Sequence, residues 1–474
     1  MIIGRKKEQQ LLLSLVEKED PQFCVVYGRR RVGKTYLVRE TFNYRFAFQH
    51  TGVAKGTFKQ QLAAWRDSLR LAGMSKCTLP KSWFEAFDML KNLIQQLPSG
   101  KKVIYIDELP WMDTPKSNLI SALELFWNGW ATARAEKDIV LIVCGSATSW
   151  ISKKLLKDKG GLRGRLTEKL MLRPFTLAEC EQYAQAQGLA MERRDVLETY
   201  MILGGIPYYW SFLRRGQSVA QNTDALFFAE DAPLGDEFEA LYHVLFRNPA
   251  KYMKVIDALS NRRMGSTREE ILRQTKLEDG GSFTSILEDL EQCGFIRRYV
   301  PFGGYEQGAL YQLIDNYTLF HYRCIRKNSY SDEHYWSHTC NSAEHNVWLG
   351  LAFERVCLQH IPQIKEALGV SGVMSNVCSW RTEGNAEHPG AQIDLLISRS
   401  DNVINLCEMK YCHVLYSLEQ QDAEDLQCKL NVFRQVTGTR HSIHLTLVTT
   451  FGLKRSGHWN MVQNEITMDD LFRQ

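Results

Sequence analysis

A glycine-rich segment near the start of the chain has the residue types that hold phosphate groups. It follows the apolar run Phe23–Tyr27 and consists of Gly28, Arg29, Arg30, Arg31, Val32, Gly33, Lys34 and Thr35, the pattern G-x-x-x-x-G-K-[ST]. Its glycines allow backbone N–H groups to turn toward phosphate oxygens. We expect Lys34 to reach the β- and γ-phosphates of a nucleotide and Thr35 to bind Mg²⁺. A predicted helix over 35–41 follows directly, which disfavours an accidental match.

Two acids follow a second apolar run and complete this chemistry. Val103–Ile106 leads into Asp107 and Glu108. We expect Asp107 to hold Mg²⁺ through water and Glu108 to orient the attacking water. Acids in this position otherwise cap helices, so the prediction depends on the phosphate-binding segment about 70 residues upstream. A third apolar run, Leu141–Cys144, ends at Ser146, which is suited to sense a γ-phosphate, although Gly-Ser is also a common turn.

Two acids and a lysine in the last third of the chain form a second candidate site. Strand periodicity places Glu408 and Lys410 on one face of their strand. If the hairpin is centred on residue 401, Asp394 lies opposite Glu408 and all three side chains converge. Such a set can bind Mg²⁺ or Mn²⁺ and activate water against a phosphodiester. The two predicted strands are Ala391–Ile397 and Val403–Lys410.

The rest of the composition describes an ordinary globular chain. The 474 residues predict two to four domains, and 44% hydrophobic with 24% charged residues is typical of globular proteins. No apolar stretch approaches the roughly 20 residues of a membrane span, and no signal segment opens the chain. We therefore expect a cytoplasmic protein without a membrane partner. The cysteines include no C-x-x-C pair, which disfavours disulfides and structural zinc.

The net charge of +4 is unevenly distributed. From residue 341 onward, 11 Lys and Arg stand against 15 Asp and Glu, a net charge of −4, while the preceding part carries +8. A free-standing nuclease usually offers phosphates a basic track. The negative net charge of the last third therefore argues for caution about DNA cleavage. Its acids are also compatible with a protein-binding module in which they no longer have a catalytic role.

The order of apolar runs indicates which elements position the first set of residues. Residues 1–172 alternate short apolar runs with longer helical patterns, which predicts a parallel α/β sheet. The expected strands are Phe23–Tyr27, Arg45–Gln49, Val103–Ile106 and Ile139–Cys144.

The middle of the chain reads as helices followed by a winged helix-turn-helix. Roughly 175–235 is mostly helical, and near 250–325 come two helices, a third at 282–293 and strands at 295–300 and 309–313. The presumed recognition helix carries acids and no arginine or lysine, and acidic side chains would repel DNA phosphates. A role in transmitting a nucleotide-dependent movement is therefore at least as compatible with this helix as the recognition of DNA bases. The acids are Glu288, Asp289 and Glu291. Residues 327–341 read as a linker, and the remainder as helix, three strands, helix and strand.

The sequence resembles the AAA+-related ATPases of the STAND group, particularly archaeal and bacterial ATPases with a nuclease-like C-terminal domain. The resemblance spans essentially the whole chain. It rests on Ile3-Gly4-Arg5-x-x-Glu8, 28–35, Asp107-Glu108, Gly145-Ser146, Leu162–Arg165, Leu172–Phe175 and Gly204–Pro207. The implied fold is a P-loop NTPase parallel sheet at 1–174, a helical lid at 175–240, a winged helix-turn-helix at 241–326 and an α/β restriction-endonuclease-like domain at 341–474.

The resemblance also implies nucleotide contacts that the residues alone do not indicate. In that family the opening segment lines the adenine pocket, which implies Ile3, Gly4 and Arg5. A G-x-P element of the lid contacts nucleotide, which implies Gly205 and Pro207, although these residues by themselves read as a helix break. The family, together with the lack of an N-K-x-D motif, favours ATP over GTP.

The C-terminal acids match the PD-(D/E)xK nuclease superfamily, here as D-x13-E-x-K. Many members add an acid from an upstream helix, and Glu354 suits that role because it shares a helical face with Leu351 and Leu358. A second Mg²⁺ or Mn²⁺ would then be held by Glu354, Asp394 and Glu408. Ile393 stands where the family has a proline, a variation found among its distant members.

Arg163 and Arg165 lie in a basic stretch that follows several lysines in 153–159. An arginine directed at a γ-phosphate could act as a finger or sensor, and Arg165 is our candidate. A solvated positive face explains the same residues equally well.

Two hypotheses follow. The first is an ATP-driven switch or motor that controls a C-terminal nuclease-like module acting on DNA. The second is an ATP-gated regulatory or scaffold protein whose nuclease fold is inactive. A homo-oligomer that depends on nucleotide is compatible with both.

Overall fold

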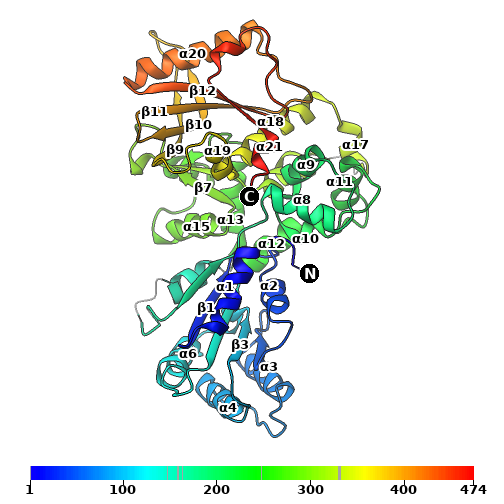
Figure 1. The fold of residues 1–474 in the computed structure, drawn as a ribbon, viewed down its shortest axis with the longest axis vertical. Coiled ribbons are helices and arrows are strands. Elements are labelled where there is room, and N and C mark those ends of the chain that lie inside the picture. Colours follow the sequence, from blue (N-terminus) through cyan, green and yellow to red (C-terminus); the bar gives the residue numbers. More distant parts are fainter. Residues whose placement is uncertain (1, 147, 157–159, 163, 247, 329–331) are drawn as a thin grey trace. The chain divides into compact units, whose positions relative to one another are not determined.

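The chain divides into two compact units, residues 1–174 and 175–474. The computed structural model describes residues 2–146, 148–156, 160–162, 164–246, 248–328 and 332–474. Within these ranges no helix combines the length and apolar character needed to cross a membrane. Each unit has sheets and helices of its own (Figure 1).

The first unit is built on a parallel sheet with strand order β2-β3-β4-β1-β5. Its strands are β1 (Gln22–Tyr27), β2 (Phe48–Thr51), β3 (Lys102–Asp107), β4 (Ile139–Gly145) and β5 (Glu168–Met171). β3 and β4 are buried along their whole length, as expected for parallel strands covered on both faces. The predicted parallel sheet is confirmed.

The helices of this unit are α1 (Lys6–Glu17), α2 (Lys34–Thr41), α3 (Phe58–Leu71), α4 (Trp83–Gln95), α5 (Leu109–Met112), α6 (Leu119–Phe126) and α7 (Thr148–Ile151). The wider helical turns η1 (Trp127–Ala131) and η2 (Ser152–Leu156) continue α6 and α7.

Two strands differ from the sequence prediction. β2 begins at Phe48 rather than at residue 45, because the chain leaves α2 through left-handed residues Asn43 and Tyr44 and first bonds to β3 at Ala47. β5 lies outside the predicted strands. It is short and mostly polar, and within it only Leu170 is buried, so it lacks the apolar run that identified the others.

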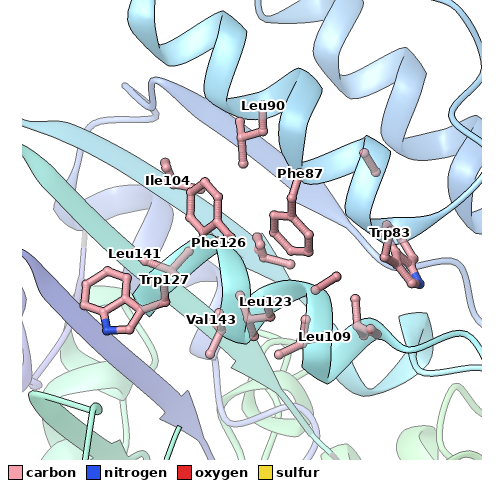
Figure 2. Packing of buried hydrophobic residues seen from close by; sticks show 14 of the residues in the cluster. Trp83, Phe87, Leu90, Ile104, Leu109, Leu123, Phe126, Trp127, Leu141 and Val143 are labelled. Carbon is pink, nitrogen blue, oxygen red and sulfur yellow. The ribbon is translucent and has the colours of Figure 1, made fainter. Parts of the chain in front are cut away.

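Aromatic side chains of α3, α4 and α6 form the core on one face of this sheet. Phe87 of α4 and Phe126 of α6 have ring centroids 5.2 Å apart and belong to the same cluster as Ile104 of β3 (Figure 2). Burying each such side chain stabilises the fold by about 1.5–3 kcal/mol. The core therefore fixes β3 and β4, whose ends carry Asp107 and Ser146.

The second unit begins with helices and contains several more around its two sheets. They are α8 (Leu177–Ala186), α9 (Arg193–Leu203), α10 (Pro207–Trp210), α11 (Val219–Phe227), α12 (Glu237–Leu245), α16 (Asn316–Arg323), η4 (Ile325–Lys327), α17 (Tyr335–Thr339), α18 (Ala343–Gln359) and α19 (Ile361–Ala367). The mostly helical reading of 175–235 is confirmed.

The segment 327–341, predicted as a linker, contains regular structure in the part that the structure describes. It contains α17, and Trp336 on that helix is 4% exposed. The buried carboxylate of Asp224 on α11 accepts hydrogen bonds from the backbone N–H groups of Trp336, at 2.8 Å, and Ser337, at 3.2 Å. This contact between α11 and α17 has no local sequence signal, because 112 residues separate its partners.

A small module at 249–313 combines three helices with an antiparallel sheet of order β6-β8-β7. Its elements are α13 (Pro249–Ser260), β6 (Ser266–Thr267), α14 (Arg268–Thr275), α15 (Gly281–Gln292), β7 (Ile296–Tyr299), η3 (Glu306–Gly308) and β8 (Leu310–Leu313). The third helix and the two later strands fall where the sequence predicts them. Asp289 on α15 is 6% exposed and accepts a hydrogen bond from Tyr252 at 2.7 Å, so this acid packs inside the module.

The C-terminal sheet has strand order β13-β12-β11-β10-β9 and is mixed (Figure 1). β9 (Ser375–Thr382), β10 (Ala391–Arg399) and β11 (Val403–Lys410) pair antiparallel, whereas β11, β12 (Ser442–Thr449) and β13 (Asn464–Thr467) pair parallel. The helix α20 (Gln420–Thr437) packs on the sheet through Leu426 and Phe433, and α18 also packs against β11. η5 (Trp459–Met461) and α21 (Met468–Leu471) complete the unit.

Candidate functional site

The glycine-rich loop lies between β1 and α2, as the sequence predicts. Gly28 has φ +142°, and a Cβ at this position would stand 2.2 Å from the carbonyl oxygen of Leu172. Because the backbone after β5 occupies that space, only glycine fits. Arg31 and Gly33 also have positive φ, so the loop reverses direction within a few residues before α2 begins. Arg29 and Val32 are buried, while Arg30 and Thr35 are partly exposed.

Lys34 is the first residue of α2 and is 5% exposed. Its ammonium donates hydrogen bonds to the carbonyl oxygens of Gly28 at 3.0 Å and Arg29 at 2.8 Å. The loop therefore wraps around the lysine and fixes a positive charge at its centre. This arrangement can neutralise phosphate oxygens that accept from the loop N–H groups.

Thr35 and Asp107 are brought together from α2 and the end of β3. The Thr35 hydroxyl donates to Asp107 Oδ2 at 2.9 Å across 72 residues of sequence. A hydroxyl and a carboxylate oxygen are the hard ligands that Mg²⁺ accepts at phosphate sites. The residues present therefore fit a Mg²⁺ ion, which Thr35 and Asp107 would hold.

Glu108 and Ser146 meet because β3 and β4 are parallel neighbours whose ends lie at the same edge. Glu108 Oε2 accepts from the Ser146 backbone N–H at 3.1 Å and from its hydroxyl at 3.0 Å. Burial raises the pKa of Glu108, while the charge of Lys34 and the Ser146 hydrogen bonds oppose that rise. A partly desolvated carboxylate of this kind is a stronger proton acceptor than an exposed one.

The opening segment reaches the same edge of the sheet. Arg5 is 7% exposed and donates to the Arg173 carbonyl oxygen at 2.6 Å. The backbone N–H of Leu172, the residue before Arg173, donates to the carbonyl oxygen of Tyr27, which directly precedes the loop. Arg5 is thus placed near the loop, and Ile3 and Gly4, both partly exposed, precede it.

Among the remaining nucleotide-site candidates, Arg165 is not brought to this cluster within the described residues of the first unit. Arg165 is exposed in a turn, where its backbone N–H donates to Leu162, and the described residues give its guanidinium no contact with the loop. Arg163 lies outside the described residues. Gly205 and Pro207 belong to the second unit. There Gly205 accepts from the Phe175 backbone N–H at 2.6 Å, and Pro207 begins α10.

The register of β10 and β11 confirms the predicted hairpin alignment. The ladder runs from the Ser398–Ile404 pair to the Leu395–Cys407 pair, which is the register expected for a hairpin centred on residue 401. Lys410 Nζ lies 3.5 Å from Glu408 Oε1, as expected for neighbours on one strand face. A pocket of about 360 Å³ opens beside them, and its walls include Gln392, Glu408, Lys410 and Lys429.

The third acid lies on α18 and meets Asp394 through an arginine. Glu354, whose side chain is 5% exposed, accepts from Arg263 Nε at 2.9 Å, and Arg263 Nη2 contacts the other Glu354 oxygen. Arg263 Nη2 also lies 3.2 Å from Asp394 Oδ2. Burial and the negative charge of Asp394 raise the pKa of Glu354 to about 7, against the opposing effect of Arg263.

The proposed second metal does not fit these acids as they are arranged. No group of His, Cys, Asp or Glu in the described part of the chain has the arrangement of a metal site. The oxygens that would coordinate an ion bond instead to cations of the chain. Glu354 and Asp394 bond to Arg263, while Glu408 bonds to Lys429 at 2.9 Å.

Sequence reasoning missed Arg263 and Lys429. Arg263 has no spacing signal, since 91 residues separate it from Glu354 and 131 from Asp394. Lys429 could have been found, because helical spacing places it on the face of α20 that also carries the buried Leu426 and Phe433. A lysine on an apolar helix face indicates a buried acid opposite it.

The parallel sheet, the glycine-rich loop and the acids at the end of β3 define the class of P-loop ATPase domains. Residues 3–212 match the model of a family described as an ATPase domain predominantly from Archaea. The chain therefore contains a P-loop ATPase domain.

Similarity to other proteins extends beyond that domain. Over 419 residues the chain is 24% identical to an uncharacterized protein of Methanocaldococcus jannaschii, with 85% of each chain covered. It is 18% identical to a solved Walker-type ATPase of Pyrococcus abyssi, covering 67% of this chain and 95% of that one at a TM-score of 0.48. A signal transduction ATPase with numerous domains from Pyrococcus horikoshii is 15% identical, with 77% and 55% covered and a TM-score of 0.31.

Proposed function

We propose that the chain is an AAA+-like switch that binds and hydrolyses ATP. The observation that carries the proposal is the hydrogen bond between Thr35 and Asp107, which joins the loop to the acids of β3. An isolated glycine-rich turn would not need this partner. Glu108 and Ser146 supply a base and its positioning group beside it.

Each residue of the cluster has a role in hydrolysis. The loop N–H groups and Lys34 bind the phosphates, and Thr35 with Asp107 would hold Mg²⁺. When bound, Mg²⁺ neutralises the charge that develops on the phosphate oxygens. Glu108 accepts the proton of the attacking water, and its raised pKa favours that transfer. Ser146 keeps the Glu108 carboxylate oriented through its N–H and hydroxyl.

Further residues complete the proposed nucleotide site. Ile3, Gly4 and Arg5 would line the adenine pocket, and Gly205 with Pro207 would close over the nucleotide from a lid at 175–240. Arg5 supports this because its bond to Arg173 ties the opening segment to the backbone beside the loop. Arg165, exposed in its turn, is proposed as an arginine finger.

Nucleotide binding and phosphate release measured on the full chain test the ATPase proposal. Lys34→Ala should weaken ATP binding by about 10- to 100-fold, since it removes a charge-assisted bond to phosphate. Glu108→Gln should retain binding and lose at least about 100-fold of turnover. Lys59→Ala, at an exposed position on α3, serves as the control. Unchanged turnover in Glu108→Gln would remove Glu108 from its proposed role.

We also propose that residues 341–474 form a nuclease-like module of the PD-(D/E)xK type that acts on DNA, with a winged helix-turn-helix at 241–326. The register of the β10–β11 hairpin, the contact of Lys410 with Glu408 and the pocket beside these two residues support this proposal. DNA incubated with Mg²⁺ or Mn²⁺, with and without ATP, should be cut by the wild-type chain and not by Glu408→Gln. Glu424→Gln, exposed on α20, is the matched control.

A second candidate is a regulatory or scaffold protein that keeps the nuclease fold without cleavage. The bonds of Glu354 and Asp394 to Arg263 favour it, since these acids already have a cation. Absence of cleavage of duplex, single-stranded and branched DNA by the wild-type chain would favour this candidate.

A further inference from the structure

Arg263 lies between two acids that come from separate elements of the second unit. Its Nε and Nη2 contact both oxygens of Glu354 on α18, and Nη2 also reaches Asp394 on β10 at 3.2 Å. A guanidinium presents parallel N–H groups that match a carboxylate, so the contact with Glu354 is forked. One arginine thus joins both acids.

The burial of the acids explains why they need a cation. The side chains of Glu354 and Asp394 are 5% and 15% exposed, whereas that of Arg263 is 54% exposed. Two carboxylates taken from water beside each other are unstable unless positive charge compensates them. The half-exposed guanidinium of Arg263 supplies that positive charge.

The turn that carries Arg263 is firmly built. Gly265 closes it with a bond to the Arg262 carbonyl oxygen at 3.1 Å. Gly265 has φ +89°, and a Cβ there would stand 2.2 Å from the Tyr311 carbonyl oxygen, so the turn packs directly on β8. The fold of the small module therefore fixes where the guanidinium points.

The backbone of Arg263 is held from two further directions. Its carbonyl oxygen accepts from the side chains of Gln312 on β8 and Arg355 on α18. Arg355 directly follows Glu354 and also donates to the Leu313 carbonyl oxygen at 3.1 Å. Helix α18 thus holds the backbone of the turn through Arg355 and the guanidinium of Arg263 through Glu354.

Other cations near the acids are engaged elsewhere. Arg297 donates to the Gln312 side chain at 2.6 Å, and Arg355 donates to backbone carbonyl groups, so both support the turn. Lys410 and Lys429 contact Glu408. Among the described residues, Arg263 is the cation whose side chain bonds to Glu354 and Asp394.

We propose that Arg263 is an internal plug, which occupies the cation position of Glu354 and Asp394 and competes there with a divalent metal. The inference rests on the proposed nuclease-like module, because it concerns the metal that such a module needs. Arginine and metal compete for the same oxygens, so the guanidinium lowers the affinity of these acids for a divalent ion. Removing the guanidinium creates a site with the charge and hard oxygens that Mg²⁺ and Mn²⁺ prefer.

Mn²⁺ binding to the full-length chain tests the plug without relying on activity. Free Mn²⁺ is measured by electron paramagnetic resonance in the absence of nucleotide. Arg263→Gln should bind one ion at least about 10-fold more tightly than the wild type, which corresponds to roughly 1.4 kcal/mol. Adding Asp394→Asn to that variant should abolish the gain. Arg262→Gln, an exposed neighbour on the same turn, should behave as the wild type.

A second substitution keeps the test decisive if Arg263→Gln folds poorly, as judged by urea unfolding followed by tryptophan fluorescence. Arg263→Lys retains a positive charge but loses the forked contact, so its Mn²⁺ affinity should lie between those of wild type and Arg263→Gln. Equal affinity in wild type and both variants, or tight Asp394-dependent binding in the wild type, overturns the plug.

DNA cleavage separates this inference from the proposed function. If Arg263→Gln binds Mn²⁺ through Asp394 but cuts no DNA, the plug stands and the nuclease proposal fails. If the wild type cuts DNA through Glu408 while its Mn²⁺ affinity equals that of Arg263→Gln, the plug fails and the nuclease proposal stands.

Discussion

The Thr35 hydroxyl lies 2.9 Å from Asp107 Oδ2 and donates a hydrogen bond to it. Thr35 is on the first turn of α2, and Asp107 is the last residue of β3. β4 lies between β1, which leads into α2, and β3, so the contact spans a strand of the sheet. It joins the phosphate-binding loop to the acids, and the ATPase chemistry depends on it.

Thr35 should therefore tolerate only a substitution that keeps its hydroxyl. Thr35→Val, which is nearly the same size, should lower Mg²⁺-dependent ATP turnover by about 100-fold, since it removes a metal ligand. Thr35→Ser should stay within a few-fold of the wild type. Phosphate release over a Mg²⁺ titration measures both, and equal turnover in the two variants would contradict the assignment.

Ser146 should act as a positioning residue whose loss changes the pH profile. Its hydroxyl bond stabilises the charged form of Glu108 and lowers the pKa of Glu108. In Ser146→Ala that pKa should rise, so the acidic limb of the kcat profile should move to higher pH. We expect kcat to fall by about 5- to 10-fold, the value of one hydrogen bond, with KM for ATP retained.

Ser146→Thr is the matched control for that experiment, because it restores a hydroxyl. Recovery of both kcat and the acidic limb in Ser146→Thr is expected. A profile that does not move in Ser146→Ala would show that the hydroxyl does not tune Glu108.

Asp224 should be a stability determinant of the second unit. Its carboxylate is 4% exposed and caps the start of α17 through the Trp336 and Ser337 backbone N–H groups. Asp224→Ala leaves these donors without their acceptor and should lower the free energy of unfolding by about 2–4 kcal/mol. Urea unfolding followed by tryptophan fluorescence measures the loss, with the exposed Asp231→Ala as control.

His360 should make stability depend on pH. Its ring is buried between α18 and α8, where Nε2 accepts from the Leu177 backbone N–H at 3.2 Å. Burial lowers the pKa of His360 from 6.5 to about 4. The unfolded chain therefore binds a proton between pH 6.5 and 4 that the folded chain does not, so stability falls as pH falls through that window.

The size of this effect follows from the pKa difference. His360 should account for up to about 3 kcal/mol of the loss between pH 6.5 and 4, at roughly 1.4 kcal/mol per pKa unit. The free energy of unfolding of His360→Gln is measured over the same pH range and subtracted from that of the wild type. The difference is the contribution of His360, because the other buried groups remain in both proteins. If the wild type and the variant lose stability in parallel from pH 6.5 to 4, His360 has no such role.

The strongest sequence predictions concerned residues that are close in sequence. The loop at 28–35, the acids after β3 and the register of the β10–β11 hairpin depend on local periodicity and short turns. Such features are set by backbone geometry over a few residues. The boundaries of β2 and the existence of β5 were harder, because a left-handed exit from α2 and a mostly polar strand carry little apolar signal.

The sequence alone determined the chemistry available to this protein, because it specifies the types of residue that could act. These residues are 28–35, Asp107 and Glu108 in the first unit, and Asp394, Glu408 and Lys410 in the second. Only the tertiary structure decided which partners these residues meet. Arg263 reaches Glu354 across 91 residues, and Lys429 reaches Glu408 from α20. The physical reason is that a buried carboxylate takes whichever cation packing brings near it, and packing between distant elements leaves no fixed spacing in the sequence.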